Sequence, residues 1–145
     1  MKNRKMMSLV LIVLLLQACS HTANFSSVPA EAEIKIGKTQ ISGVAPQTGS
    51  ISNTTFGRYP VKVQKDGYKP IYGNLPLKVS PGIIILDALL FAPAAFFNVQ
   101  RALSFYEFDL DQGVIKYKKT NDDKWETYVI PEDQKNAAKV YFGDK

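Results

Sequence analysis

The chain has few residues whose chemistry could support a reaction. Cys19 is its only cysteine and His21 its only histidine, and both lie near the N-terminus. A thiol can act as a nucleophile beside an imidazole, and at the end of an apolar leader it can instead carry a lipid. A metal site needs three or four ligands of this kind, which a single histidine cannot supply. The interpretation of the chain therefore depends on Cys19.

Acidic residues provide a second candidate. Glu107, Asp109 and Asp111 alternate along the sequence, as in the first half of a calcium loop, but the twelfth position of such a loop is Thr120 here and not Glu. Lysines of the next predicted strand can pair with these carboxylates across a solvated face. Because a serine elbow and a histidine cluster are also missing from the sequence, we expect no catalytic residue, no metal site and no enzyme activity.

The first 18 residues have the layout of a secretory signal. Lys2, Arg4 and Lys5 precede an apolar run over residues 6–16. This run is too short to cross the roughly 30 Å hydrocarbon core of a bilayer as a helix. We therefore expect residues 1–18 to be a signal peptide.

The end of this run resembles a bacterial lipobox: it reads Leu16-Gln17-Ala18-Cys19, with Gln17 in place of the usual small or aliphatic residue. The resemblance implies a covalent lipid on Cys19, and stable anchoring takes at least two acyl chains. Ser20 follows where an aspartate would imply retention in the inner membrane, so the resemblance implies an outer-membrane location facing the periplasm. The alternative is an uncleaved anchor in which Cys19 is an ordinary buried residue.

Charge and composition limit the partners. Three of the 18 basic residues and none of the 13 acidic residues lie in residues 1–18, so the net charge is +2 instead of +5 without that segment. Nucleic-acid binding needs a clustered basic face and is not expected. With Cys19 lipidated, a disulfide cannot form, and no cofactor beyond the lipid is expected. The expected partners are the membrane, through the lipid, and an envelope protein or glycan.

Residues 19–28 are interpreted as the lipidated cysteine and a short polar tether, and residues 29–145 as a single domain. Alternation of apolar and polar residues predicts strands over residues 33–36, 51–56 and 59–64, with glycines and a proline marking a loop between the first two. Asp66-Gly67 is a turn signal, and the prolines that follow favour an edge strand.

Residues 27–72 resemble a PEGA domain, a small β-sandwich found on surface and envelope proteins. A proline and a small residue precede a strand that ends at Gly37. The following Gly43-Val44-Ala45-Pro46 is similar to the Gly-x-Thr-Pro of the family. Gly57-Arg58-Tyr59 then opens an alternating strand that leads to Gly67-Tyr68. The signature Pro-Glu-Gly-Ala is Pro29-Ala30-Glu31-Ala32 here. The resemblance implies a PEGA-like β part over residues 29–79, an envelope location and no catalytic residue.

Residues 80–101 form an apolar segment, in which Asp87 is the only charge over residues 83–97. As a helix, that run would be about 22 Å long, and Pro93 would interrupt it. Two interpretations stay open: a helix buried against the sheet, or a surface that meets the bilayer or another protein. The candidate interface residues are Ile84, Leu86, Leu89, Leu90, Phe91, Phe96, Phe97 and, outside this segment, Trp125. The alternative for Trp125 is an aromatic residue in the core or at its rim.

The remaining residues, 102–145, are predicted to form a hairpin, a strand and a helix. The expected elements are the hairpin strands 105–110 and 114–118, a strand over 125–130, and a helix that opens at Pro131, packs back through Val140 and Tyr141, and ends at Gly143. The predicted fold class is mainly β with minor α: a small PEGA-like β-sandwich with an apolar helical segment and a C-terminal β-hairpin and helix.

Two functions are compatible with these features. The favoured one is a membrane-anchored envelope lipoprotein, a non-catalytic structural or adaptor module that binds another envelope component. The alternative is a membrane-associated oligomeric assembly that uses residues 83–97 as its apolar interface.

Overall fold

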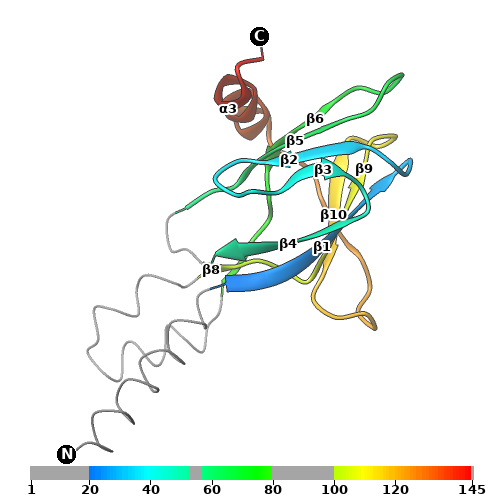
Figure 1. Cartoon of the computed structure of the whole chain (residues 1–145), viewed down its shortest axis with the longest axis vertical. Coiled ribbons are helices and arrows are strands. Elements are labelled where there is room, and N and C mark those ends of the chain that lie inside the picture. Colours follow the sequence, from blue (N-terminus) through cyan, green and yellow to red (C-terminus); the bar gives the residue numbers. More distant parts are fainter. Residues whose placement is uncertain (1–19, 53–56, 80–99, 145) are drawn as a thin grey trace, which may run out of the picture.

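The computed structural model describes residues 20–52, 57–79 and 100–144 (Figure 1). Strands predominate in these residues, so the predicted fold class, mainly β with minor α, is confirmed. The elements are β1 (Ser20–Val28), β2 (Glu33–Ile36), β3 (Ser42–Val44), β4 (Gln47–Ser52), β5 (Pro60–Gln64), β6 (Ile71–Asn74), β7 (Lys78–Val79), β8 (Gln100–Arg101), β9 (Phe105–Asp109), β10 (Val114–Lys118), β11 (Glu126–Tyr128) and α3 (Glu132–Phe142).

The larger sheet has β1 in its interior. Its order is β11-β10-β9-β1-β4, with β1 antiparallel to β4 and parallel to β9. Ala23, Phe25 and Ser27 are buried, and the residues between them are exposed or half-buried. The prediction of a tether over residues 20–28 is therefore wrong. Few apolar residues suffice here because neighbouring strands satisfy the backbone of β1 on both sides.

The smaller sheet has the order β3-β2-β5-β6, and its neighbouring strands are all antiparallel. The predicted strands 33–36 and 59–64 correspond to β2 and β5, and the turn between β5 and β6 contains Gly67 at a φ of 83°, which glycine adopts readily. β6 lies at the edge of this sheet, as the prolines predicted. The loop expected before residue 51 instead contains β3 and most of β4.

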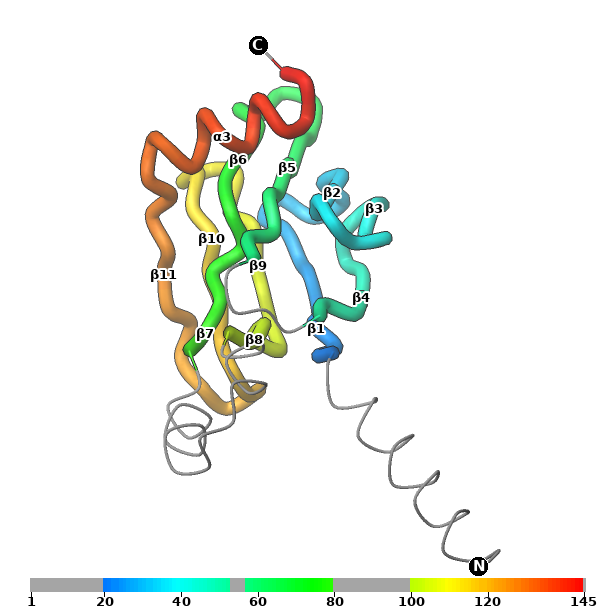
Figure 2. Tube along the Cα trace, turned by 90° about the vertical axis from the view of Figure 1, so that its left-hand side faces the viewer, coloured from blue at the N-terminus to red at the C-terminus, as the bar shows by residue number. Residues whose placement is uncertain are grey.

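The two sheets enclose a common core, which confirms the predicted small β-sandwich (Figures 1 and 2). Phe25, Tyr106 and Phe108 fill it from the larger sheet, and Ile34 and Val63 fill it from the smaller one. The ring of Phe25 stacks on the rings of Tyr106 and Phe108, with centroid distances of 5.5 and 6.4 Å. The residue at the centre of this aromatic stack thus comes from the segment that resembled a tether.

The C-terminal elements follow the prediction, except for one face of the helix. β9 and β10 form the expected hairpin, and α3 follows Pro131 and ends at Gly143. The helix covers β5 and β6 (Figure 2). Ala138 is its buried residue, whereas Val140 is 79% exposed. The expected packing of Val140 is therefore wrong, because residues two positions apart do not share a helix face.

Candidate functional site

Trp125 is the predicted interface residue that falls within the described chain. Its side chain is 40% exposed beside the start of β11. The Nζ of Lys118 lies 4.9 Å from the ring centre of Trp125 and 5.2 Å from that of Phe105, so the ammonium contacts two aromatic rings through cation–π interactions. The same Nζ donates a hydrogen bond to the carbonyl of Asn121 at 2.8 Å. These contacts fix the connection between β10 and β11.

An open hollow of about 470 Å³ lies beside Trp125 and Phe105. Lys118 is the only charged residue that lines it within the described chain. The hollow thus combines aromatic surface, hydrogen-bonding groups and one cation, without a carboxylate or thiol. Such a lining suits the binding of a partner. Its uncharged polar residues are Asn24, Ser26, Gln47, Thr48 and Asn121.

One end of the molecule brings together several chain segments, and we call it the anchor end. β1 begins there with Ser20, which pairs with Ser52 in β4. Val79 and Gln100 pair directly, so the chain leaves β7 and re-enters β8 at a single place. This end lies opposite α3 and the C-terminus (Figures 1 and 2). Cys19 is therefore covalently adjacent to the end from which residues 80–99 depart.

The hydroxyl of Tyr106 ties the anchor end to the core. It donates a hydrogen bond to the carbonyl of Pro76 at 2.8 Å and accepts one from the backbone N–H of Leu103 at 2.8 Å. Tyr106 is fully buried, and burial raises the pKa of its phenol well above the ordinary value. This hydroxyl therefore holds both flanks of the β7–β8 pair against the larger sheet.

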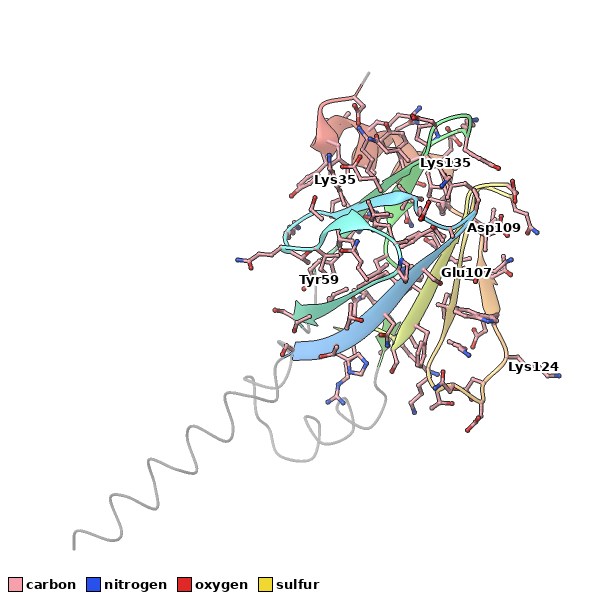
Figure 3. The ribbon with its side chains drawn as sticks, turned by 45° about the vertical axis from the view of Figure 1, so that its right-hand side comes forward. Lys35, Tyr59, Glu107, Asp109, Lys124 and Lys135 are labelled. Atoms are coloured by element: carbon pink, nitrogen blue, oxygen red, sulfur yellow. The ribbon has the colours of Figure 1, made fainter. Side chains whose placement is uncertain are left out.

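The acidic residues of the hairpin form ion pairs with Lys116. Asp109 accepts hydrogen bonds from the Nζ of Lys116 at 2.7 Å and from the backbone N–H of Gln112 at 2.9 Å, and Glu107 lies 3.8 Å from the same Nζ. Figure 3 labels the two acidic residues, Glu107 and Asp109. The predicted cross-strand pairing is confirmed, but the solvated face is wrong for Asp109, which is only 3% exposed between β1 and β10. Within the described residues, no group of three or more His, Cys, Asp or Glu side chains could hold a metal ion.

The ion pair also sets the protonation of Asp109. Burial alone would raise the pKa of this carboxyl. The hydrogen bonds from Lys116 and from the backbone outweigh burial, so the pKa lies below its ordinary value. Asp109 therefore stabilises the fold above about pH 4, and this contribution is lost as the pH falls through the lowered pKa.

Lys116→Met is expected to destabilise the protein at neutral pH, because Asp109 would then keep a buried charge without its cation. In the variant, burial raises the pKa of Asp109, and protonation in acid removes the penalty. Thermal unfolding should give a lower Tm for the variant than for the wild type at about pH 7. This difference in Tm should be smaller at about pH 3. Glu107→Gln, which loses only the 3.8 Å contact, should differ little at either pH. A difference in Tm of equal size at both pH values would contradict this role of Lys116.

The other predicted site residues lie outside the described chain. They are Cys19 and the apolar candidates Ile84, Leu86, Leu89, Leu90, Phe91, Phe96 and Phe97. Their proposed roles stay predictions. Sequence reasoning missed Lys118 and Phe105 as neighbours of Trp125. The alternation around them predicted the two strands, but it gives no sign that the loop returns Trp125 to the end of β10.

No family model, curated protein or solved structure matches the chain. The similarity of residues 27–72 to a PEGA domain therefore stays a prediction. Among the described residues, no helix has the length and apolar character needed to cross a bilayer.

Proposed function

We propose that the protein is a lipid-anchored, non-catalytic module of the bacterial outer membrane that faces the periplasm. In this proposal residues 1–18 are the signal peptide and Cys19 carries the lipid. The lipobox resemblance supports the anchor. The described residues support a binding role, because Trp125 and its hollow offer aromatic and polar groups to a partner.

One observation carries the proposal: the residue after Cys19 already belongs to the folded sheet. Ser20 pairs with Ser52, and the same strand continues between β4 and β9. A lipid on Cys19 would therefore act on a strand in the interior of the larger sheet, without a flexible spacer. The anchor would then fix the orientation of the anchor end as well as the location of the protein. Trp125 lies in the connection at that end, where a membrane-attached partner can reach it.

Cys19→Ala is expected to abolish lipid attachment and to shift nearly all of the protein out of the outer-membrane fraction, since the thiol is the attachment atom. Metabolic labelling with a radioactive fatty acid and membrane fractionation measure the two effects. Ser20→Asp is a matched variant, because it keeps the thiol and should retain labelling while moving the protein to the inner membrane. Unchanged labelling in Cys19→Ala would overturn the proposed anchor.

A second candidate is an oligomeric assembly that uses residues 83–97 as a shared apolar surface. It is favoured by the pairing of Val79 with Gln100, which brings both flanks of the apolar segment to the anchor end. Light scattering of the lipidated protein in detergent distinguishes the two functions. A defined oligomer that dissociates on Leu90→Asn would support the assembly, and a monomer would support the single module.

A further inference from the structure

The anchor end carries an exposed basic surface. Lys78 and Arg101 lie on the β7–β8 pair, and Lys119 and Lys124 lie on the connection between β10 and β11; all four are exposed. Figure 3 shows Lys124 at the end of the molecule where that connection turns, pointing away from the sheets. We call these four residues, with Val79 and Trp125, the anchor-end surface.

Two members of this surface form an unfavourable pair. Lys78 and Arg101 are direct cross-strand partners, and like charges in this position repel each other. Neither side chain forms an ion pair with any residue that the structure describes. A two-residue ladder with this repulsion is poorly stabilised by itself. An anion placed between the two cations would remove the repulsion, so the pair is suited to bind one.

A hollow of about 430 Å³ extends this basic region, and Lys78, Lys119 and Lys124 line it. Its two carboxylates are partly engaged by neutral donors. Hydrogen bonds from the side chain and the backbone N–H of Thr120 lower the pKa of Asp123, and the charges of Lys119 and Lys78 lower it further. Glu126 accepts a hydrogen bond from the hydroxyl of Tyr117. With Asp122, which is also exposed in this connection, the acidic residues only partly offset the cations.

Two exposed apolar side chains adjoin basic residues in the chain: Val79 follows Lys78, and Trp125, which lines the hollow beside Lys118, follows Lys124. Val79 is 46% exposed and Trp125 is 40% exposed. Tryptophan is enriched at the level of lipid headgroups, where its ring is partly buried and its N–H remains hydrated. Lysine and arginine beside such residues extend their charges toward phosphates. The combination matches a membrane interface better than a protein interface, whose core is depleted in charge.

We infer that the anchor-end surface docks on anionic lipid headgroups. The inference rests on the proposed lipid anchor, which would place this surface next to the bilayer, and it identifies the envelope component that Trp125 meets. Phosphate groups neutralise Lys78 and Arg101, while Trp125 and Val79 enter the headgroup layer. The membrane is then both the attachment point and the ligand.

The sole tryptophan of the chain supplies the probe for a test. Lipidated protein from membranes is reconstituted into vesicles of phosphatidylcholine alone or with phosphatidylglycerol, each containing brominated acyl chains that quench nearby tryptophan. We expect strong quenching of Trp125 in the anionic vesicles and weak quenching in the neutral ones. Each basic residue near an anionic surface changes partitioning by about fivefold. Lys78→Gln with Arg101→Gln should therefore lower the docked-to-undocked ratio by about 25-fold.

The matched control removes two exposed lysines beside α3, through Lys38→Gln and Lys69→Gln. Because it changes the net charge equally at the opposite end, it should leave the quenching unchanged. Equal quenching in neutral and anionic vesicles, or equal losses in the two double variants, would overturn the inference. So would a Trp125 that responds to isolated peptidoglycan but not to either vesicle. Failure of the anchor itself is a separate result, because the protein would then carry no lipid by mass spectrometry and would not sediment with vesicles.

Discussion

Phe25→Ala is expected to lower the free energy of unfolding by about 3–5 kcal/mol, a large share of the 5–15 kcal/mol typical of a domain. Phe25 is 1% exposed, and its ring stacks between those of Tyr106 and Phe108. Removing it leaves a cavity between partners that are held by their own strands. Equilibrium denaturation by urea, monitored by Trp125 fluorescence, measures the loss.

The control for this variant lies on the same strand. Thr22→Ala changes an exposed residue of β1 and should alter the stability by less than about 0.5 kcal/mol. The comparison also decides between two descriptions of residues 20–28. If they were a tether, both variants would unfold like the wild type. A stable Phe25→Ala protein would therefore show that β1 contributes little to the core.

Tyr106→Phe is expected to cost about 1–3 kcal/mol of stability, because the half-buried carbonyl of Pro76 and the buried N–H of Leu103 both lose their partner. The ring itself remains, so the core should keep its packing. The loss should concentrate at the anchor end. Hydrogen exchange should become faster at the amide of Leu103 and in the β7–β8 pair, while the amides of β2 and β5 keep their protection.

The same variant should alter the response to alkali. Burial raises the pKa of Tyr106, so above about pH 10 the phenol ionises in the unfolded chain but not in the folded one. The free energy of unfolding of the wild type therefore falls as the pH rises beyond that value. The difference in this free energy between the wild type and Tyr106→Phe should become smaller. Tyr68→Phe is the control, because Tyr68 is 38% exposed in the turn between β5 and β6. If the stability difference between the wild type and Tyr106→Phe grows as the pH rises, Tyr106 is not the buried phenol that resists ionisation.

Local sequence signals predicted the parts of the fold that depend on local structure. The hairpin around Gly113 combines two alternating strands with a residue that accepts a φ of 68°. The helix that ends at Gly143 begins after a proline and has acidic residues in its first turn, both of which favour a helix start. β2 and β5 were predicted because half of their residues are apolar and alternate strictly. In each of these elements, the residues that decide the conformation are neighbours in the chain.

The missed elements depend on partners far away in the sequence. β1 and β4 are rich in serine and threonine, and they become strands because they pair with each other and because β1 also pairs with β9, about 80 residues later. The burial of Asp109 follows from the same parallel pairing, which places β9 inside the sheet. The local pattern of residues 20–28 does not indicate that they pair with a parallel strand far along the chain. A polar tether was therefore the simpler prediction.

The candidate site was predicted in part. Trp125 could be chosen from composition, because a lone tryptophan is often a core or binding residue. The pairing of Lys78 with Arg101 could not be chosen in this way. The two residues are separated by the whole apolar segment, and only the ladder between β7 and β8 brings them together. Their repulsion becomes visible once that register is known.

The position of β1 has a mechanical consequence for an anchored protein. The strand starts at the anchor end and is hydrogen-bonded to β4 on one side and to β9 on the other (Figure 1). Its hydrogen bonds run across the strand, so a force transmitted from a lipid at residue 19 along β1 loads both ladders together in shear. Such a load must break many bonds at once before the strand can slide. The resistance of the anchored protein to being pulled from the membrane would then depend on the rate of forced unfolding as well as on the membrane affinity of the acyl chains.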